Sequence, residues 1–200
     1  PGETLLIPAC IDKFVLLLLI CLIWGGNMVS IKISNQGIPP LLAATLRSLI
    51  ASILLMVYAT VKGETVFFRR SHLRAGIIVG ILFGLDFFCL YLGTSYTHAS
   101  RAVIFLYTHP MWVAMGAHFV LADDRLSWIK SMGLTLSFLG LISVFGSKTP
   151  SLQPLYWLGD LMEVGAAIFW AATTLYIKRI FSAQSMNHMQ VLLAQLLFSI

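Results

Sequence analysis

Trp24-Gly25-Gly26-Asn27-Met28-Val29-Ser30-Ile31-Lys32 has a related copy about 146 residues later, where the chain reads Trp170-Ala171-Ala172-Thr173-Thr174-Leu175-Tyr176-Ile177-Lys178. Both copies lie in apolar segments long enough to cross a bilayer. About five such segments fit into one repeat period, and an odd number of crossings reverses the direction of the chain. The second copy is therefore expected to lie upside down relative to the first. Inverted repeats of this kind are typical of secondary transporters, which bind their substrate between the two halves.

The composition places the chain in a membrane. Apolar residues make up 58% of its 200 residues and charged residues only 10%, whereas soluble domains carry about 25% charged residues. The net charge of +5 lies mostly in the predicted loops, which indicates membrane orientation rather than nucleic-acid binding. The cysteines show neither metal nor disulfide spacing and are expected to be packing residues. They are Cys10, Cys21 and Cys89.

Six membrane-spanning helices and the start of a seventh are predicted, because a span needs about 20 mainly apolar residues. Connections between them are short, so neighbouring helices should pack antiparallel. The sequence therefore predicts an all-α, polytopic transmembrane helix bundle. The predicted spans are residues 14–33, 41–61 (after Pro39-Pro40), 75–96, 99–121, 127–146 and 157–180, and the seventh opens near Met189.

The basic residues predict the orientation of the bundle, because cytoplasmic loops carry the excess of Lys and Arg. Nine basic residues lie on the side of the N-terminus and three on the opposite side, so we expect the N-terminus in the cytoplasm. The sixth helix then enters from outside, as an inverted repeat requires. The nine are Lys13, Lys62, Arg69, Arg70, Arg74, Arg125, Lys130, Lys178 and Arg179, and the three are Lys32, Arg101 and Lys148.

Ionisable residues inside predicted spans are costly in lipid and are functional candidates for that reason. Arg47 lies within the second span, Asp86 near the middle of the third and His109 near the middle of the fourth. Glu163 precedes Trp170 by seven residues in the sixth span, so the two share a helix face. We predict a polar cavity near the membrane midplane. Its predicted lining is Trp24, Asn27, Arg47, Asp86, His109, Trp112, Glu163 and Trp170.

The predicted cavity residues allow more than one role. Arg47 either neutralises a substrate carboxylate or forms a structural pair with Asp86 and snorkels outward. Asp86 or Glu163 is a candidate carrier of a coupling proton, because an ionised carboxylate is costly within the membrane. His109 either lines the cavity or hydrogen-bonds to a neighbouring helix. Pro110 lacks a backbone donor and is predicted to kink the fourth helix.

The order of these residues resembles that of the EamA family of the drug/metabolite transporter superfamily. The opening Trp-Gly, the following Lys, the Pro-Pro pair and the Arg of the second helix are similar to Trp24-Gly25, Lys32, Pro39-Pro40 and Arg47. The likeness covers essentially the whole chain. Its further positions are Tyr96-Thr97-His98-Ala99-Ser100-Arg101-Ala102, Pro110, Asp123-Asp124-Arg125-Leu126, Gly159-Asp160-Leu161 and Trp170-Ala171.

The resemblance implies ten helices in two five-helix repeats. The chain, which we expect to be a fragment of a longer protein, then holds about six and a half of them. Residues 1–148 form the first repeat and residues 149–200 the start of the second. Two positions depart from related patterns. Glu163 falls where the family usually has an apolar residue, and the first helix lacks the carboxylate of the small multidrug resistance proteins.

The implied activity is that of a permease in the inner or plasma membrane, which imports or exports small organic metabolites by alternating access. The expected partners are the lipid bilayer and a small-molecule substrate, with amino acids or their derivatives as one candidate class. Protons are a candidate coupling ion. Neither a cofactor nor a metal is expected, and no nucleic acid.

Two other classes of membrane protein are alternatives to a transporter. A structural or assembly membrane protein accounts for the glycines of the helices but not for the inverted repeat or the mid-span charges. An intramembrane protease needs Gly-x-Ser-Gly or Gly-x-Gly-Asp, and Gly84-Leu85-Asp86 lacks the second glycine. Gly146-Ser147-Lys148-Thr149 is not an ATP-binding loop, because Ser147 separates glycine from lysine. An enzyme is therefore not expected.

Overall fold

The computed structural model describes residues 6–64, 70–121, 126–145, 154–183 and 187–199, and within these ranges all regular secondary structure is helical. The predicted all-α bundle is thereby confirmed. Arg69, Arg125, Lys148 and the acidic pair Asp123-Asp124 lie outside the described residues. The helices are α1 (Leu6–Gly37), α2 (Pro40–Lys62), α3 (Arg70–Tyr96), α4 (Ala99–Leu106), α5 (His109–Val120), α6 (Trp128–Phe145), α7 (Tyr156–Ala183) and α8 (His188–Leu197).

Five segments of the described chain are long and apolar enough to cross a membrane. One of them, Ala99–Val120, combines α4 and α5. The apolar stretches of α6 and α8 are shorter, at Trp128–Ser143 and His188–Leu197. The other four long segments are Lys13–Gly37, Pro40–Lys62, His72–Tyr96 and Tyr156–Ile180.

The helix ends differ from the predicted span ends where no residue stops the helix. α1 runs over Leu6–Gly37 rather than residues 14–33, because hydropathy marks only the part of a helix that lies in lipid. The ends of α2, by contrast, are set by local chemistry. Pro40 occupies the first turn, where its missing N–H costs nothing. Gly63 ends the helix with a left-handed φ of 67°, and its N–H donates to the carbonyls of Ala59 and Thr60.

The fourth predicted span is divided into two helices. α4 ends at Leu106, Tyr107 and Thr108 form a turn, and α5 begins at His109. Pro110 lies in the first turn of α5. A proline there has no N–H to donate to the carbonyl four residues earlier, which is that of Leu106, so a continuous α-helix would lose this bond. The interruption is therefore sharper than the predicted kink.

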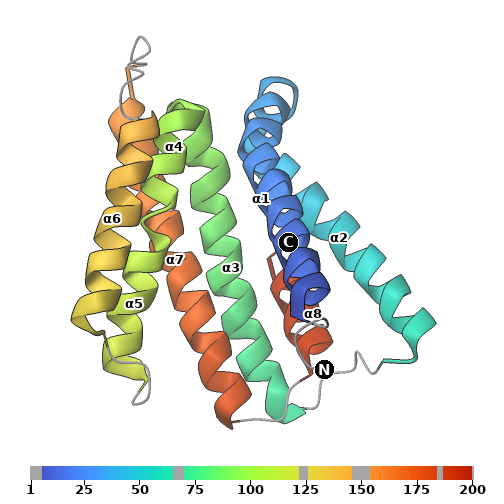
Figure 1. Ribbon diagram of the computed structural model, residues 1–200. Coiled ribbons are helices and arrows are strands. Elements are labelled where there is room, and N and C mark those ends of the chain that lie inside the picture. Colours follow the sequence, from blue (N-terminus) through green and yellow to red (C-terminus); the bar gives the residue numbers. More distant parts are fainter. Residues whose placement is uncertain (1–5, 65–69, 122–125, 146–153, 184–186, 200) are drawn as a thin grey trace.

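α3 and α7 form the centre of the bundle and make its most extensive helix contact. Figure 1 shows α4, α5 and α6 on one side of this pair and α1, α2 and α8 on the other. Small residues allow the close approach of α3 and α7. Ala166 and Ala167 are fully buried, and a β-carbon on Gly159 would lie 2.8 Å from the Gly93 carbonyl oxygen. Such small-residue faces are typical of helix packing in membranes.

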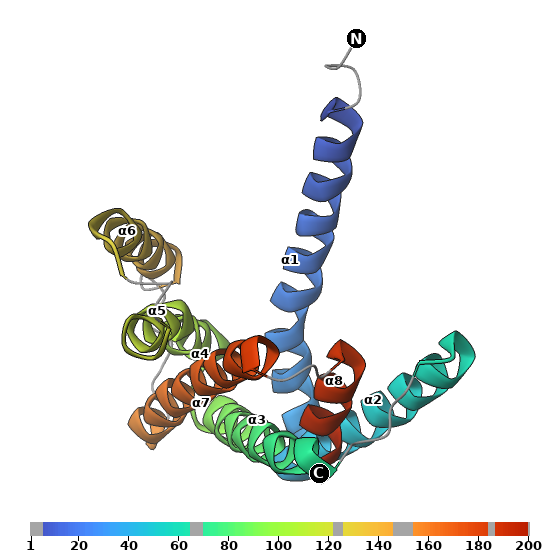
Figure 2. The ribbon, with the colours of Figure 1, turned by 90° about the horizontal axis from the view of Figure 1, so that it is seen from below.

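The first half of α1 projects away from this centre (Figure 2), and its apolar side chains from Phe14 to Ile20 are exposed. Leu22 is 72% exposed, and on α6 Ile129 is 81% exposed. In water such surfaces would be a liability. Because the described part of the chain holds five apolar segments of membrane length, we expect lipid or further helices to cover these surfaces.

Gly80 of α3 is where α8 comes closest, which gives a stability prediction. A β-carbon on Gly80 would overlap the Cβ of Phe198 and lie 2.9 Å from the Ala194 carbonyl oxygen. We expect Gly80→Ala to lower the free energy of unfolding in detergent by about 1–3 kcal/mol through overpacking. Gly140→Ala on α6 is the matched control, because a β-carbon there meets nothing within 4 Å. Equal stability of the two variants would contradict this docking of α8.

Candidate functional site

A cavity of about 590 Å³ lies among α1, α2, α3, the α4–α5 turn and α7. This volume is in the range of small-molecule binding sites. Five of the predicted cavity residues line it, namely Trp24, Asn27, Arg47, Asp86 and Trp170. Three of the ten remaining lining residues are aromatic, namely Phe83, Phe87 and Tyr107. The cavity therefore combines aromatic walls with one guanidinium and one carboxyl group.

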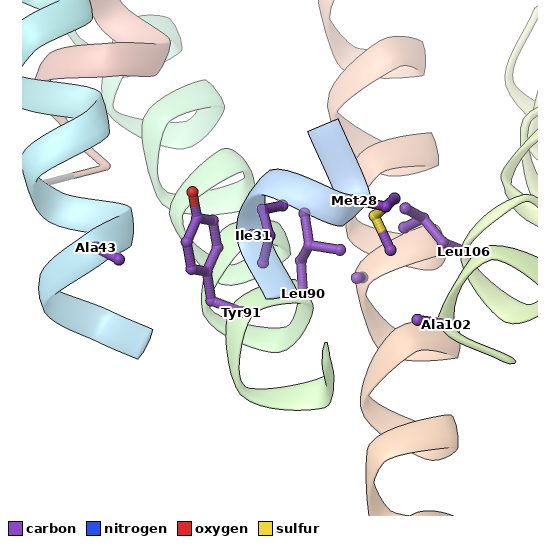
Figure 3. Packing of buried hydrophobic residues seen from close by; sticks show 8 residues of the cluster. Met28, Ile31, Ala43, Leu90, Tyr91, Ala102 and Leu106 are labelled. Atoms are coloured by element: carbon purple, nitrogen blue, oxygen red, sulfur yellow. The ribbon is translucent and has the colours of Figure 1, made fainter. Parts of the chain in front are cut away.

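One wall of the cavity rests on the main hydrophobic cluster (Figure 3). Met28 and Ile31 of α1 pack there against Leu90 of α3 and Leu106 of α4. Met28, Leu90 and Leu106 also line the cavity. The same packed side chains thus hold three helices together and shape the binding space.

Arg47 and Asp86 do not satisfy each other, although both line the cavity. Nη1 of Arg47 and Oδ1 of Asp86 are buried and have no hydrogen-bond partner. In the described part of the chain no ion pair within 4.0 Å joins the two side chains. The Arg47 guanidinium instead lies 3.9 Å from the centre of the Phe87 ring, in a cation–π contact. Both residues line the cavity, and each therefore keeps one polar atom whose hydrogen-bonding capacity the protein does not use.

Three aromatic rings stack beside the cavity. The ring centroids of Trp24 on α1 and Trp170 on α7 are 5.0 Å apart, and those of His109 and Trp170 are 4.2 Å apart. The interplanar angles are 25° and 24°. Trp24 and Trp170 occupy the same position in the two related sequence stretches. The stack therefore brings together the matching positions of the predicted repeats.

Three predicted site residues lie outside the cavity lining. His109 stacks on Trp170, and its Nε2 is buried without a hydrogen-bond partner. Trp112 donates from Nε1 to the hydroxyl of Thr108 at 3.1 Å, so it ties α5 to the α4–α5 turn. Glu163 is fully buried between α7 and α3, at Thr94.

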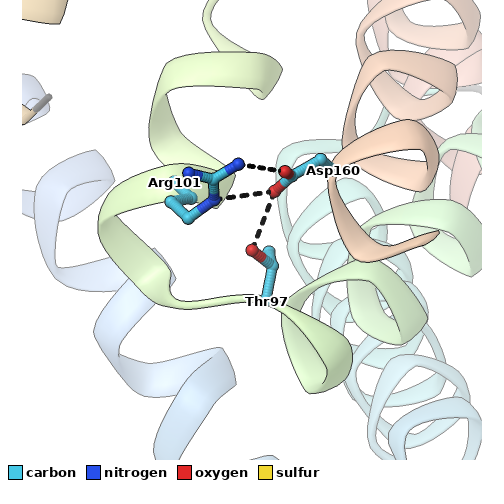
Figure 4. A network of polar contacts seen from close by, with 3 residues as sticks. All are labelled: Thr97, Arg101 and Asp160. Carbon is cyan, nitrogen blue, oxygen red and sulfur yellow. Dashed lines mark hydrogen bonds and ion pairs between the residues drawn. The ribbon is translucent and has the colours of Figure 1, made fainter. Parts of the chain in front are cut away.

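A polar network ties α7 to the junction of α3 and α4 (Figure 4). The hydroxyl of Thr97 donates to Oδ1 of Asp160 at 2.8 Å. Nε of Arg101 donates to the same oxygen at 3.3 Å, and Nη2 forms an ion pair with Oδ2. A bidentate arginine–carboxylate pair is among the stronger polar contacts in proteins.

Lys32 of α1 completes the closure of this end of the bundle. Its Nζ donates to the carbonyl oxygens of Thr94 at 2.6 Å and Thr97 at 2.7 Å. The last carbonyls of a helix lack intrahelical partners, and α3 ends at Tyr96. A lysine at this position satisfies them and opposes the negative end of the helix dipole.

Several residues of this site carry no clear sequence signal. Phe87 and Tyr91 lie one and five residues after Asp86, and both interact with Arg47. The spacing of three to four residues along α3 places Tyr91 near Phe87, but only the fold brings Arg47 of α2 to them. The sequence placed Lys32 at the outer end of the first predicted span, but its contact with α3 carried no sequence signal.

The five long apolar helices, the small-residue packing and the cavity between the helices define a multi-pass membrane protein. Residues 13–146 match the EamA-like transporter family, and the chain belongs to that family. This family match agrees with the resemblance of the sequence motifs to the EamA family.

Curated relatives agree with this assignment. The uncharacterized transporter YoaV of Bacillus subtilis is 28% identical over 85% of this chain and 58% of its own length. An uncharacterized transporter of Buchnera aphidicola is also 28% identical, over 73% of this chain and 49% of its own length. Protein PagO of Salmonella typhimurium is 23% identical over 92% of this chain and 62% of its own length. The chain thus spans about half the length of the curated relatives it matches, and no solved structure matches it.

Proposed function

We propose that the full-length protein is a permease that moves a zwitterionic amino acid, or a derivative of one, by alternating access between two inverted repeats. The observation that carries this proposal is the pair of unsatisfied opposite charges in one cavity, on Arg47 and Asp86. A zwitterion supplies a carboxylate for the guanidinium and an ammonium for the aspartate. The aromatic walls favour an apolar substrate side chain.

The inverted-repeat part of the proposal has support from the ring stack. Trp24 and Trp170 match in the two related stretches, and their rings meet beside the cavity. Substrate sites of inverted-repeat transporters form at the interface of the repeats. A site at the meeting point of matching residues fits that arrangement.

The proposed orientation has the N-terminus in the cytoplasm of a cell whose inner or plasma membrane holds the protein. Its support is the distribution of basic residues, nine on the N-terminal side and three on the other. In this orientation the Arg101–Asp160 pair and Lys32 lie at the outer end of the bundle. The described conformation is then closed on the outside. Asp86 and Glu163 are the candidate carriers of a coupling proton.

The test is solute flux into proteoliposomes that contain the full-length protein. The panel consists of amino acids, nucleosides and cationic drugs, each measured with and without a pH gradient. We expect saturable flux of amino acids with apolar side chains, and stimulation by the gradient. Saturable flux confined to nucleosides or to cations would contradict the zwitterion site, since neither class offers both charges to Arg47 and Asp86.

A further inference from the structure

Glu163 is a buried carboxyl group that the substrate cavity does not use. It is fully buried on α7 and is absent from the cavity lining. It precedes Trp170 of the cavity by seven residues, which is about 10 Å along the helix at 1.5 Å per residue. It follows Asp160 of the closed end by three residues. Glu163 therefore lies between the cavity and the end of the bundle that Arg101 and Asp160 close.

The Thr94 hydroxyl faces two acceptors, one of them Oε1 of Glu163, but has a single hydrogen. The Thr94 hydroxyl is within hydrogen-bond distance of both the Leu90 carbonyl oxygen and Oε1 of Glu163, the latter at 3.1 Å. A hydroxyl carries a single hydrogen but accepts through its lone pairs. When that hydrogen goes to Leu90, the Glu163 contact is complete only if the carboxyl group itself carries a hydrogen and donates it to Thr94. The geometry thus fits a protonated Glu163.

The charges around Glu163 do not neutralise an ionised carboxylate. Lys32 of α1, Asp86 of α3 and Asp160 of α7 are the charged groups that act on it. The Lys32 ammonium is engaged with two α3 carbonyls, and Asp160 is engaged with Arg101 and Thr97. Oε2 of Glu163 has no hydrogen-bond partner. An isolated buried carboxylate is very costly, whereas the neutral acid is not.

The backbones of α3 and α7 approach each other so closely at Glu163 that the carboxyl group fills the space between them. A β-carbon on Gly93 would lie 2.9 Å from Oε1 of Glu163 and 3.1 Å from the Gly159 carbonyl oxygen. α3 and α7 therefore meet through two glycines at this level. A proton, which needs no coordination sphere, fits such a contact better than a metal cation, which needs several oxygen ligands.

We propose that Glu163 is the binding site of the coupling proton and is separate from the substrate cavity; this inference rests on the proposed transport function. In the closed conformation the carboxyl group holds one proton and donates it to Thr94. Separation of α3 from α7 exposes Glu163 to water and frees Lys32 from the α3 carbonyls. The carboxylic acid then releases its proton to water, and the ammonium of Lys32 becomes the counter-ion of the carboxylate.

The first test is infrared spectroscopy of the full-length protein in lipid, which needs no knowledge of the substrate. We expect an absorption band of a protonated carboxylic acid at neutral pH that Glu163→Gln removes and the control Leu161→Ala keeps. Leu161 is 60% exposed on the same helix. Thr94→Val should keep the band but shift it, because the hydrogen bond is lost. A band of undiminished intensity in Glu163→Gln, or one that does not move in Thr94→Val, would overturn the proposal.

The second test measures leucine accumulation in proteoliposomes with a pH gradient across the membrane, imposed in one direction and then in the other. With one proton per substrate, one pH unit sustains up to about tenfold accumulation. We expect Glu163→Gln to abolish accumulation while leucine exchange at equal pH persists. Accumulation by Glu163→Gln as in the unmodified protein, or accumulation driven by sodium instead of pH, would overturn the proton site. A lack of any leucine flux contradicts the proposed substrate class, and the infrared band still decides the role of Glu163.

Discussion

Asp86→Asn is expected to reduce the rate of zwitterion uptake by the full-length protein about 100-fold while the protein still inserts into the membrane. Asp86 supplies the carboxylate of the cavity lining, and its Oδ1 has no partner within the protein. Removing one member of a buried charge pair costs about 2–5 kcal/mol. Since each 1.4 kcal/mol is a factor of ten, a loss near 3 kcal/mol corresponds to about 100-fold.

The measurement is initial uptake of leucine and of its analogue without the amino group, at equal amounts of inserted protein. Asp86→Asn should slow leucine uptake but leave the uptake of the amine-free acid nearly unchanged. That analogue has no ammonium group that could contact the Asp86 carboxylate. Leu85→Ala is the neighbouring control. Leu85 is 39% exposed and does not line the cavity. Unchanged leucine flux in Asp86→Asn would rule out its proposed role.

Arg47→Gln is expected to cause a loss of similar size with the opposite preference among analogues. The guanidinium is held over Phe87 with Nη1 unpaired, and the proposed substrate carboxylate would supply the missing partner. The variant should slow leucine about 100-fold. It should spare isopentylamine, the analogue of leucine without the carboxyl group. Arg47→Lys should recover only part of the rate, since lysine keeps the charge but not the planar fork.

The two variants together separate substrate binding from the alternative of a structural Arg47–Asp86 pair. If both side chains bind the substrate, each variant should spare the analogue that lacks the group bound by the substituted residue. If the charges only stabilise each other, both variants slow every analogue equally, and the double variant restores stability and transport. Leu46→Ala, at a 40% exposed position next to Arg47, controls for disturbance of α2.

The sequence predicts the helices of this protein better than their ends. Lipid requires long apolar segments, so residues 75–96 and 157–180 were recognisable as the spans that form most of α3 and α7. Hydropathy does not report where a helix continues beyond the lipid, as α1 does to Leu6 and Gly37. The ends of α2 at Pro40 and Gly63 can be predicted from the sequence, because proline and glycine start and stop helices through local backbone effects.

The candidate site was predictable only in part, because periodicity gives the face of a helix but not its depth or its neighbours. Glu163 shares a face with Trp170, yet two turns of helix place it beyond the cavity. Trp112 follows the break at Thr108, and its indole bonds back to that residue. The partners of Lys32 and Asp160 belong to other helices, so only the packed fold reveals the closure of that end.

The contact between Trp24 and Trp170 bears on how such a cavity evolves. When two equivalent units are related by a two-fold axis, a residue meets its own counterpart only where the axis passes. In an ancestral pair of identical half-size chains, one codon would therefore have encoded both rings, and each mutation would have changed both at once. In the proposed inverted-repeat architecture, duplication and fusion would let the two positions mutate independently. One ring can then be exchanged while the other persists, which gives a symmetric ancestor a path to an asymmetric substrate.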